Sequence, residues 1–340
     1  LKRVSCPGLK IVECPHLIRA ISPLTDLKAY FFLKKLFREE KYDVVHTHSS
    51  KAGIVGRFAA KAAHVPFVAH TIHGLAFHRY EKFWKNFIYI ASERAAAPCG
   101  KRIYAVAQAM IDQSLAAGVG KPEQYKVVYS GMELEPFLTS KPDPELRKSL
   151  GIPENAVVFA TLARLFPLKG YETFIPVAIK LAKEIPDIHY LIIGNGSMME
   201  EIQAQIAEAG LEKRFSFAGL VPPNEVWKYL ALSSALVHFS LREGLPRAAV
   251  QSLASGKPVI AYALDGTPEV VIPGKTGYLL QPGDRDGAEA AIREIMADPA
   301  HATELGTNGR ELVASRFGWR TMSDVLLKDY MEQLAALEKK

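Results

Sequence analysis

Short apolar runs in the second half of the chain alternate with segments whose apolar residues recur every three or four positions. The runs predict buried strands and the periodic segments predict amphipathic helices. The expected strands are 157–165, 189–196, 214–218, 235–240 and 258–262, and the expected helices are 171–184, 197–209, 224–232 and 246–255. Regular alternation of this kind predicts an α/β domain with a doubly wound parallel sheet.

The first half shows the same pattern over a shorter stretch. An apolar run at 43–50 precedes the helical segment 51–63, and a second strand is expected at 65–74. The first run ends in two serines, which are placed to cap the helix that follows. Two strands joined by a helix form a βαβ unit, so a second parallel sheet is expected here.

The segment 138–156 is polar and rich in proline, and it predicts a boundary between two domains. The expected organisation is a first domain over residues 1–140, a second over residues 141–315, and a final helix within 316–340. Ligands of such sheets bind beyond the carboxyl ends of the strands, so we expect the chemistry in the loops after the strands, facing a cleft between the two domains.

The charge of the chain is unevenly distributed. Residues 1–150 hold 23 Lys and Arg against 13 Asp and Glu, whereas the remainder holds 19 against 23. A basic first half favours an anionic partner. No nucleic-acid-binding motif is present, so nucleic acid is not expected, and an anionic membrane surface fits the same charge.

The location of the protein is predicted from what the sequence lacks. No apolar run approaches the ~18 residues needed to cross a bilayer, and the opening residues do not read as a signal peptide. The three cysteines, Cys6, Cys14 and Cys99, are too few and too irregularly spaced for a disulfide framework or a zinc site. A cytoplasmic protein, peripheral on the inner face of the membrane, is expected.

Two loops of the second half carry candidate ligand-binding residues. Arg164 and Lys169 place two cations on a strand-to-helix turn, which suits a pyrophosphate, although taken alone they fit ordinary solvated surface charges better. Gly194 and Gly196 follow the next strand. They lack the third glycine of the dinucleotide fingerprint, but they would let a backbone approach a ligand.

The segment 239–261 carries an acid just before a helix and an amide within it. Pro246 is expected at the first helical position, so Gly244 and Leu245 lie at the helix start, where free N–H groups attract an anion. Glu243 is expected to point into the same space, and Gln251 lies on the first turns of the helix. All of these side chains could reach one ligand.

The combined order of these motifs resembles a known family. RLFPLKG ahead of GNG and SLREGLPRAAVQSLASGKPVIA resembles the donor half of the retaining GT-B glycosyltransferases of glycosyltransferase family 4. DVVHTHSSKAGIVGRFAAKAAHVPFVAHTIHG is similar to the acceptor half of the bacterial exopolysaccharide and capsule branch. The resemblance covers most of the chain, but the family's opening strand and Gly-rich loop are expected before Leu1, which predicts a truncated start.

The resemblance implies a metal-independent, retaining glycosyltransferase with two Rossmann-like domains. It would move a sugar from a nucleotide sugar, with a UDP-sugar expected, to a lipid-linked or polysaccharide acceptor of the cell surface. No cofactor is implied. Arg164 and Lys169 would hold the diphosphate, and Glu243 would contact the transferred sugar beside Gly244 and Leu245. The final helix would cross back to brace the first domain.

Gln251 departs from the family pattern, because the resemblance implies an acid there that holds the nucleotide ribose. A carboxylate accepts from both ribose hydroxyls with charge assistance, whereas glutamine offers one acceptor oxygen and an NH2 donor. Losing the charge would cost on the order of 1 kcal/mol, which weakens the site without abolishing it. The alternative is that Gln251 is only an exposed helix residue.

Histidines are concentrated in the first half of the chain. His73 is implied to face the donor sugar, with Gly74 leaving room for it and Ser49 and Lys51 on the acceptor side. His46 and His48 could instead begin a metal site, but no matching ligand cluster follows them, so no metal is expected. Asp284 and Asp286 imitate a metal motif, and helix capping explains them better.

Residues 77–102 mix aromatic with basic side chains. Phe83, Trp84, Phe87 and Ile88 recur at helical spacing beside Arg79, Lys82 and Lys85, which predicts either an interfacial helix on anionic lipid or a buried core helix. Two other functions stay open from the sequence, a GT-B sugar-nucleotide epimerase and a non-catalytic nucleotide-sugar-binding protein.

Overall fold

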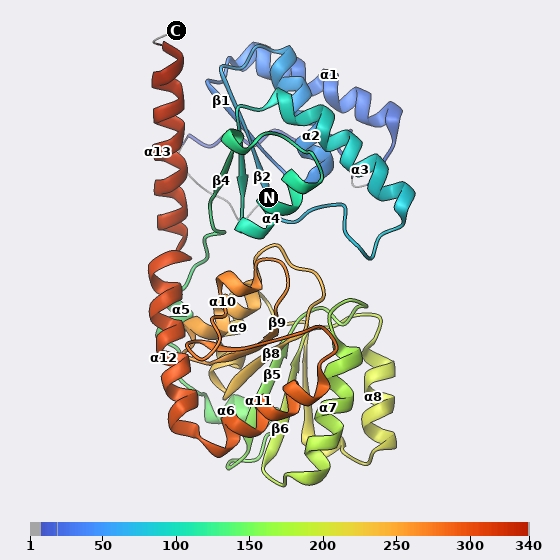
Figure 1. Cartoon of the computed structure of the whole chain (residues 1–340), viewed down its shortest axis with the longest axis vertical. Helices are drawn as coiled ribbons and strands as arrows, with labels where there is room; N and C mark the ends of the chain where they lie inside the picture. The colour runs from blue at the N-terminus through green and yellow to red at the C-terminus, as the bar shows by residue number, and fades with distance from the viewer. Residues whose placement is uncertain (1–7, 19, 339–340) are drawn as a thin grey trace. The chain divides into compact units, whose positions relative to one another are not determined.

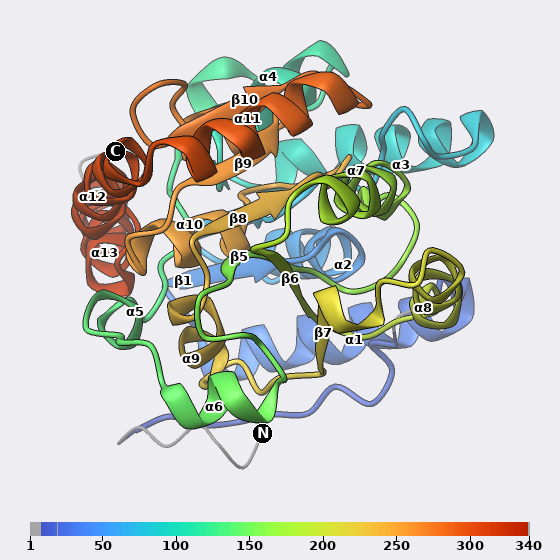
Figure 2. The same cartoon turned by 90° about the horizontal axis from the view of Figure 1, so that it is seen from below.

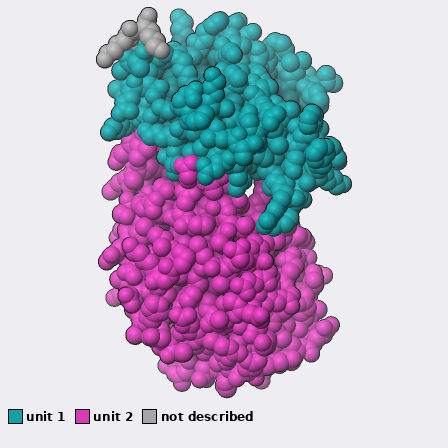
Figure 3. Space-filling view, in the orientation of Figure 1, with its two compact units in different colours: residues 1–105, 111–127, 327–340 teal, residues 106–110, 128–326 magenta. Residues whose placement is uncertain are grey.

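The computed structural model describes residues 8–18 and 20–338, so Cys6 lies outside the described residues. The chain divides into two compact units (Figure 3). The first comprises residues 1–105, 111–127 and 327–340, and the second comprises residues 106–110 and 128–326. The segment 138–156, where the sequence suggests a boundary, lies within the second unit.

The first unit is built on a parallel sheet with strand order β1-β2-β3-β4. Helix α2 packs on β1 and β2 and lies between α1 and α3 (Figure 1). The elements are α1 (Pro23–Glu40), β1 (Val44–His48), α2 (Ser50–Ala62), β2 (Phe67–Ile72), α3 (Phe83–Ala96), η1 (Ala97–Cys99), β3 (Arg102–Ala105), α4 (Gln108–Ala116), η2 (Pro122–Gln124) and β4 (Tyr125–Val127).

Two glycines allow α2 to pack closely on its sheet. A Cβ on Gly53 would lie 2.3 Å from the ring of His70, and one on Gly56 would lie 2.8 Å from the Thr47 methyl group. On the same helix, buried Arg57 pairs with Glu93 of α3 at 2.5 Å. The KAGIVGR sequence is therefore explained by helix packing, since its small residues admit the strands and its arginine ties α2 to α3.

The carboxyl-terminal part of α13 (Trp319–Glu338) belongs to the first unit. Asp329, which is almost fully buried, accepts hydrogen bonds from Arg102 at 3.0 Å, Lys126 at 3.0 Å and the Tyr104 hydroxyl at 2.6 Å. Although burial alone would raise the pKa of Asp329, these neighbours lower it. One buried carboxylate thus joins α13 to β3 and β4.

The second unit contains a parallel sheet with strand order β10-β9-β8-β5-β6-β7. Its elements are α5 (Glu135–Leu138), α6 (Pro144–Ser149), β5 (Val157–Leu162), α7 (Tyr171–Glu184), β6 (Ile188–Ile193), α8 (Met199–Glu208), η3 (Glu212–Arg214), β7 (Phe215–Gly219), α9 (Val226–Ala231), β8 (Ala235–His238), α10 (Arg247–Ala254), β9 (Val259–Tyr262), η4 (Thr267–Glu269), β10 (Gly277–Leu280), α11 (Arg285–Ala297) and α12 (Pro299–Arg316).

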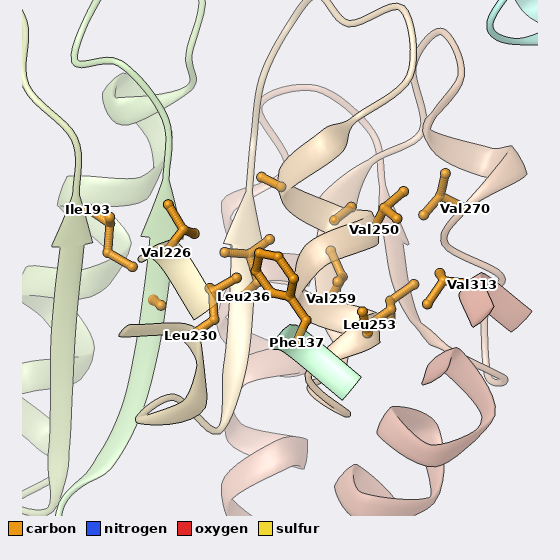
Figure 4. Close-up of a cluster of buried hydrophobic side chains, with 14 of the residues drawn as sticks. Phe137, Ile193, Val226, Leu230, Leu236, Val250, Leu253, Val259, Val270 and Val313 are labelled. Carbon is orange, nitrogen blue, oxygen red and sulfur yellow. The ribbon is translucent and has the colours of Figure 1, made fainter. Parts of the chain in front are cut away.

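Both faces of this sheet are buried, which explains its continuously apolar strands. Along β5, Val158 and Ala160 face one core while Phe159 faces the other. Helices α9, α10 and α12 cover the first core, shown in close-up in Figure 4, and α7, α8 and α11 cover the second (Figure 2). The predicted α/β architecture with parallel sheets is confirmed.

The strand order reverses at β5, which pairs with β6 on one side and β8 on the other. The loops after β5 and β8 are therefore neighbours at the carboxyl edge of the sheet. In open α/β sheets such a reversal is where ligands bind. The sequence places Lys169 in the first of these loops and Glu243 in the second.

Candidate functional site

Lys169 and Glu243 form an ion pair at the reversal point of the second sheet. The Nζ of Lys169 lies 2.7 Å from Oε1 of Glu243 and 3.2 Å from the hydroxyl of Ser240. The two loops are held in register because the Leu241 amide donates to the Leu168 carbonyl. Two of the predicted site residues, 74 positions apart, are thereby brought together.

The turn that carries Lys169 requires an unusual backbone. Gly170 has φ +81°, and a Cβ there would lie 2.1 Å from the Phe239 carbonyl oxygen. Leu168 also adopts a positive φ of 69°. The glycine lets the turn lie directly on the end of β8, so its conformation fixes where the lysine can reach.

Glu243 lies among groups that favour its ionised form. Burial alone would raise its pKa, but His238, whose Nε2 lies 3.5 Å away, and Lys169 together lower the pKa to about 2. Glu243 therefore carries a full negative charge near neutral pH. It can accept hydrogen bonds from hydroxyl groups but has no proton to donate as a general acid.

Two neighbours of Glu243 were missed in the sequence. His238 is the last residue of β8, and Asp265 follows β9, where its carboxylate accepts from the Glu243 amide at 2.9 Å. The adjacent loops interlock, because a Cβ on Gly266 would lie 2.2 Å from the Gly244 carbonyl oxygen. Their positions in the sequence could have indicated them, since both residues lie at or just after the carboxyl ends of strands.

Arg164 and the glycine loop lie close by at the same edge. Arg164 is exposed, with its guanidinium 5.3 Å from the Phe166 ring centroid. A Cβ on Gly194 would lie 1.9 Å from the Ala163 carbonyl oxygen, and one on Gly196 would lie 2.2 Å from that of Leu165. Close packing of two loops thus accounts for both glycines, and their contact with a ligand stays a prediction.

The start of α10 differs slightly from expectation. Pro246 occupies the N-cap rather than the first helical position, and the helix begins at Arg247. Leu245 is buried, and Gly244 is half-buried. Gln251 is half-buried, and among the described residues its side chain has no hydrogen-bond partner, so its amide is available to a ligand.

The predicted residues of the first unit lie at the ends of β1 and β2. His48 Nδ1 and His73 Nε2 are 3.0 Å apart, and their rings stack with centroids 5.2 Å apart. His46 is next in the cluster, bonded to Thr71 at 2.6 Å and to the hydroxyl of Tyr330. His46 is half-buried, whereas His48 and His73 are exposed, so these two residues form the solvent-facing side of the cluster.

Burial lowers the pKa values of two histidines of this cluster. It lowers the pKa of His46 to about 3, with His48 and His73 contributing, and it lowers the pKa of His48 as well. The pKa of His70, which is buried beneath them, is also lowered by burial, with Arg57 adding to the effect. His46 and His48 can therefore hydrogen-bond while adding no charge at neutral pH.

The remaining acceptor-side candidates have different surroundings. Ser49 occupies the N-cap of α2 with φ 67°, but its side chain makes no capping bond, so the predicted serine cap is wrong for this residue. Lys51 pairs with Asp26 and donates to the carbonyl of Ile18 at 2.9 Å. Gly74 is exposed, and a Cβ there would meet nothing within 4 Å.

The capping interpretation of the second-unit acid motif is confirmed. The carboxylate of Asp284 accepts from the Gly287 amide at 2.8 Å and caps α11. Within residues 8–18 and 20–338, no group of three or more His, Cys, Asp or Glu is arranged to hold a metal ion. Over the same residues, every helix is too short or too polar to span a bilayer.

Two family descriptions match the chain. Residues 142–312 match "Glycosyl transferases group 1", and residues 3–131 match "Glycosyl transferase 4-like domain". The chain is 33% identical over 288 residues to the UDP-Gal:alpha-D-GlcNAc-diphosphoundecaprenol alpha-1,3-galactosyltransferase of Escherichia coli, covering 84% of this chain and 74% of the relative. It is 26% identical to the putative glycosyltransferase EpsD of Bacillus subtilis, covering 86% and 77%.

Solved structures share the fold. The HepE protein of Anabaena, in complex with UDP, superposes with a TM-score of 0.79 at 23% identity, covering 92% of this chain and 84% of its own. Sucrose-phosphate synthase of Thermosynechococcus elongatus gives 0.79 at 25% identity, covering 92% and 79%. The chain therefore has the GT-B fold of two Rossmann-like domains and belongs to the group 1 glycosyl transferases, the glycosyltransferases of family 4.

Proposed function

We propose that this glycosyltransferase moves a sugar from a nucleotide sugar to a lipid-linked acceptor during the synthesis of a cell-surface glycan. The observation that carries the proposal is the Lys169–Glu243 pair at the reversal point of the second sheet. The E. coli relative is named for a UDP-galactose donor and a diphosphoundecaprenol acceptor. A UDP-sugar is accordingly the donor class we propose, and a polysaccharide acceptor is the second possibility.

The charges of the site match the needs of the transfer. When the bond between sugar and diphosphate breaks, negative charge develops on the leaving phosphate, and fixed cations stabilise it most in the transition state. Lys169 and Arg164 would supply those cations, with the amides at Gly244 and Leu245 beside them. Since these cations can neutralise the leaving group, we propose transfer without a divalent metal.

The ionised carboxylate of Glu243 would orient the sugar. Its low pKa, about 2, leaves it an acceptor for sugar hydroxyl groups. Gln251 would hold the ribose through its free amide, and Gly194 and Gly196 would line the same donor side. Retention of the anomeric configuration is part of the proposal and is suggested by the family resemblance alone.

The acceptor is assigned to the first unit. His73, the exposed end of the histidine cluster, would face the reacting sugar, and the open space at Gly74 would leave room for it. Ser49 and Lys51 would lie on the acceptor side. We further propose that the chain works at the cytoplasmic face of the membrane, because a lipid-linked acceptor is held there.

A transfer assay with defined products tests the proposal. The full chain is incubated with a panel of UDP-sugars and a polyprenyl-diphosphate sugar, with and without a chelator, and the product linkage is read by NMR. Glu243→Gln should lower the turnover number on the order of a hundredfold to a thousandfold. Release of UDP with a rearranged free sugar and no need for acceptor would indicate an epimerase instead.

A further inference from the structure

Helix α3 presents an apolar face that the described part of the chain leaves uncovered. Phe83 is 87% exposed, Trp84 57%, Phe87 67% and Ile88 46%. Large apolar side chains at positions i, i+1, i+4 and i+5 lie on one side of a helix. We call these four residues the α3 face. Contiguous exposed apolar surface on a soluble protein usually marks an interaction site.

The opposite side of α3 is already fixed to the first unit. Glu93 is buried against Arg57, and Ala96 is fully buried. Near the helix start, Asn86 donates to the His78 carbonyl at 2.8 Å and accepts from the His78 amide at 3.0 Å. The helix therefore packs through its other side, and the sequence alternative of a buried core helix is wrong for the α3 face.

Basic side chains border the α3 face. Lys82 is the N-cap residue, Lys85 lies within the first turn at 3.3 Å from Glu81, and Arg79 precedes them. Residues 1–127 as a whole hold 20 Lys and Arg against 9 Asp and Glu. Beside the apolar face, residues 79–85 thus hold three basic side chains against one acid, Glu81, within a half of the chain that is basic overall.

An apolar face bordered by basic side chains favours an anionic bilayer as the binding partner. Protein–protein interfaces are depleted of lysine, whereas helices that lie in the surface of an anionic bilayer combine Lys or Arg with Trp, Phe and Leu. The aromatic rings would enter the boundary between headgroups and acyl chains, and the lysines would meet lipid phosphates. An anionic bilayer complements both the apolar character and the charge of the α3 face.

We propose that the α3 face is a membrane-binding surface that inserts Phe83, Trp84, Phe87 and Ile88 into the headgroup region of an anionic phospholipid bilayer. It rests on the proposed function only in its purpose, which is to hold the chain where a lipid-linked acceptor lies. The binding itself requires no sugar nucleotide.

The binding is tested with the full chain and unilamellar vesicles by co-sedimentation. Vesicles of phosphatidylcholine with phosphatidylglycerol should bind the chain, and vesicles of phosphatidylcholine alone should bind it on the order of tenfold less. Phe87→Asp should weaken binding by about tenfold or more, since a phenyl ring that would be buried in the bilayer is replaced by a charge. Lys82→Glu should weaken it about fivefold, with the loss shrinking at high salt.

Leu220 provides a matched control. It is a large apolar residue, 82% exposed, in the second unit, so Leu220→Asp should leave vesicle binding unchanged. Equal loss in Leu220→Asp and Phe87→Asp would overturn the proposal, as would equal binding to neutral and anionic vesicles. A concentration-dependent dimer abolished by Phe87→Asp, without vesicle binding, would instead identify a second copy as the occupant and would also overturn it.

Insertion has its own spectroscopic signature. Lipids brominated on the acyl chains should quench tryptophan fluorescence of the bound chain, and Trp84→Phe should remove most of that quenching while binding is kept. Unchanged quenching in Trp84→Phe would show that another surface meets the lipid. UDP binding, measured on the same variants, should be unaffected, so a failure of this proposal is distinguishable from a failure of the proposed function.

Discussion

The two units place polar groups at the ends of parallel strands in opposite ways. In the first unit the strand ends carry a histidine cluster, in which burial keeps His46 and His48 uncharged at neutral pH. In the second unit the corresponding loops carry the fixed charges of Lys169 and Glu243. A charged diphosphate needs fixed countercharges, whereas neutral hydroxyl groups need only hydrogen bonds, so the contrast matches a donor unit and an acceptor unit.

The units also keep their charged residues in different places. The first unit buries a carboxylate, Asp329, between two cations and a tyrosine, where it serves packing. The second unit keeps its lysine–carboxylate pair partly open to solvent, with side-chain exposures of 22% and 19%. A buried pair stabilises an element, and a partly open pair can exchange a partner for a ligand.

The largest predicted effect concerns the buried carboxylate. Asp329→Ala would leave Arg102 and Lys126 without their shared partner, and we expect a loss of about 3–5 kcal/mol in the unfolding free energy of the first unit. Hydrogen exchange measured by mass spectrometry would show faster exchange in β3 and β4 and little change in β5 and β6.

Asp324, exposed on the same helix, is the matched control, and Asp324→Ala should change little. Equal acceleration of exchange in both units after Asp329→Ala would contradict the assignment of α13 residues 327–338 to the first unit.

The next largest effect is the loss of unfolding free energy of the first unit at acidic pH. The folded-state pKa of His46 is about 3, below its ordinary value near 6.5, so unfolding takes up a proton at any pH between the two. The unfolding free energy should therefore fall as the pH falls below 6.5, by up to about 1.4 kcal/mol per pH unit for each buried neutral histidine. His70 adds to this slope.

Hydrogen exchange at pH 7 and pH 5, corrected for the intrinsic rate, would measure that slope in each unit. His46→Gln should flatten it in the first unit only. The matched control is His189→Gln, because burial lowers the pKa of His189 in the second unit to about 4. A slope in the wild-type first unit no steeper than that in the second would contradict the larger number of uncharged, buried histidines in the first unit.

A smaller effect, on the affinity for UDP, is expected from substitutions of Gln251, the residue proposed to hold the ribose. Gln251→Glu restores the acid implied by the family resemblance, and charge-assisted bonds should tighten UDP binding by about fivefold, or ~1 kcal/mol. Gln251→Ala should weaken it. Calorimetry compares the three forms, and unchanged affinity in both variants would show that Gln251 does not contact the nucleotide.

The second unit was the more predictable from sequence. Its strands are buried on both faces, so continuous apolar runs marked them clearly, and α7 spans the predicted residues, Tyr171–Glu184. The sequence indicates Lys169 and Glu243 because both follow expected strands and because the motif order resembles a family. Their direct pairing was not predicted, since it depends on β5 and β8 being neighbours.

Other features could not be read from one sequence. His238 meets Glu243 from the end of β8, and Asp265 meets it from a loop that interlocks with Gly244, and no local pattern marks such contacts. The exposure of the α3 face depends on which side of the helix packs, and a mixed aromatic and basic pattern leaves that open. At Ser49 the local pattern misleads instead. Serine is favoured at helix N-caps, and Ser49 occupies the N-cap of α2, but its side chain makes no hydrogen bond to the helix backbone.

The central claim is that the charged loops of the second unit hold the diphosphate of a nucleotide sugar. Calorimetric titration of the full chain with UDP, beside Lys169→Ala and the control Lys183→Ala on the same unit, tests it most directly. We expect saturable binding that Lys169→Ala weakens about tenfold or more and that Lys183→Ala leaves unchanged. Absent binding, or equal affinity in all three proteins, would contradict it.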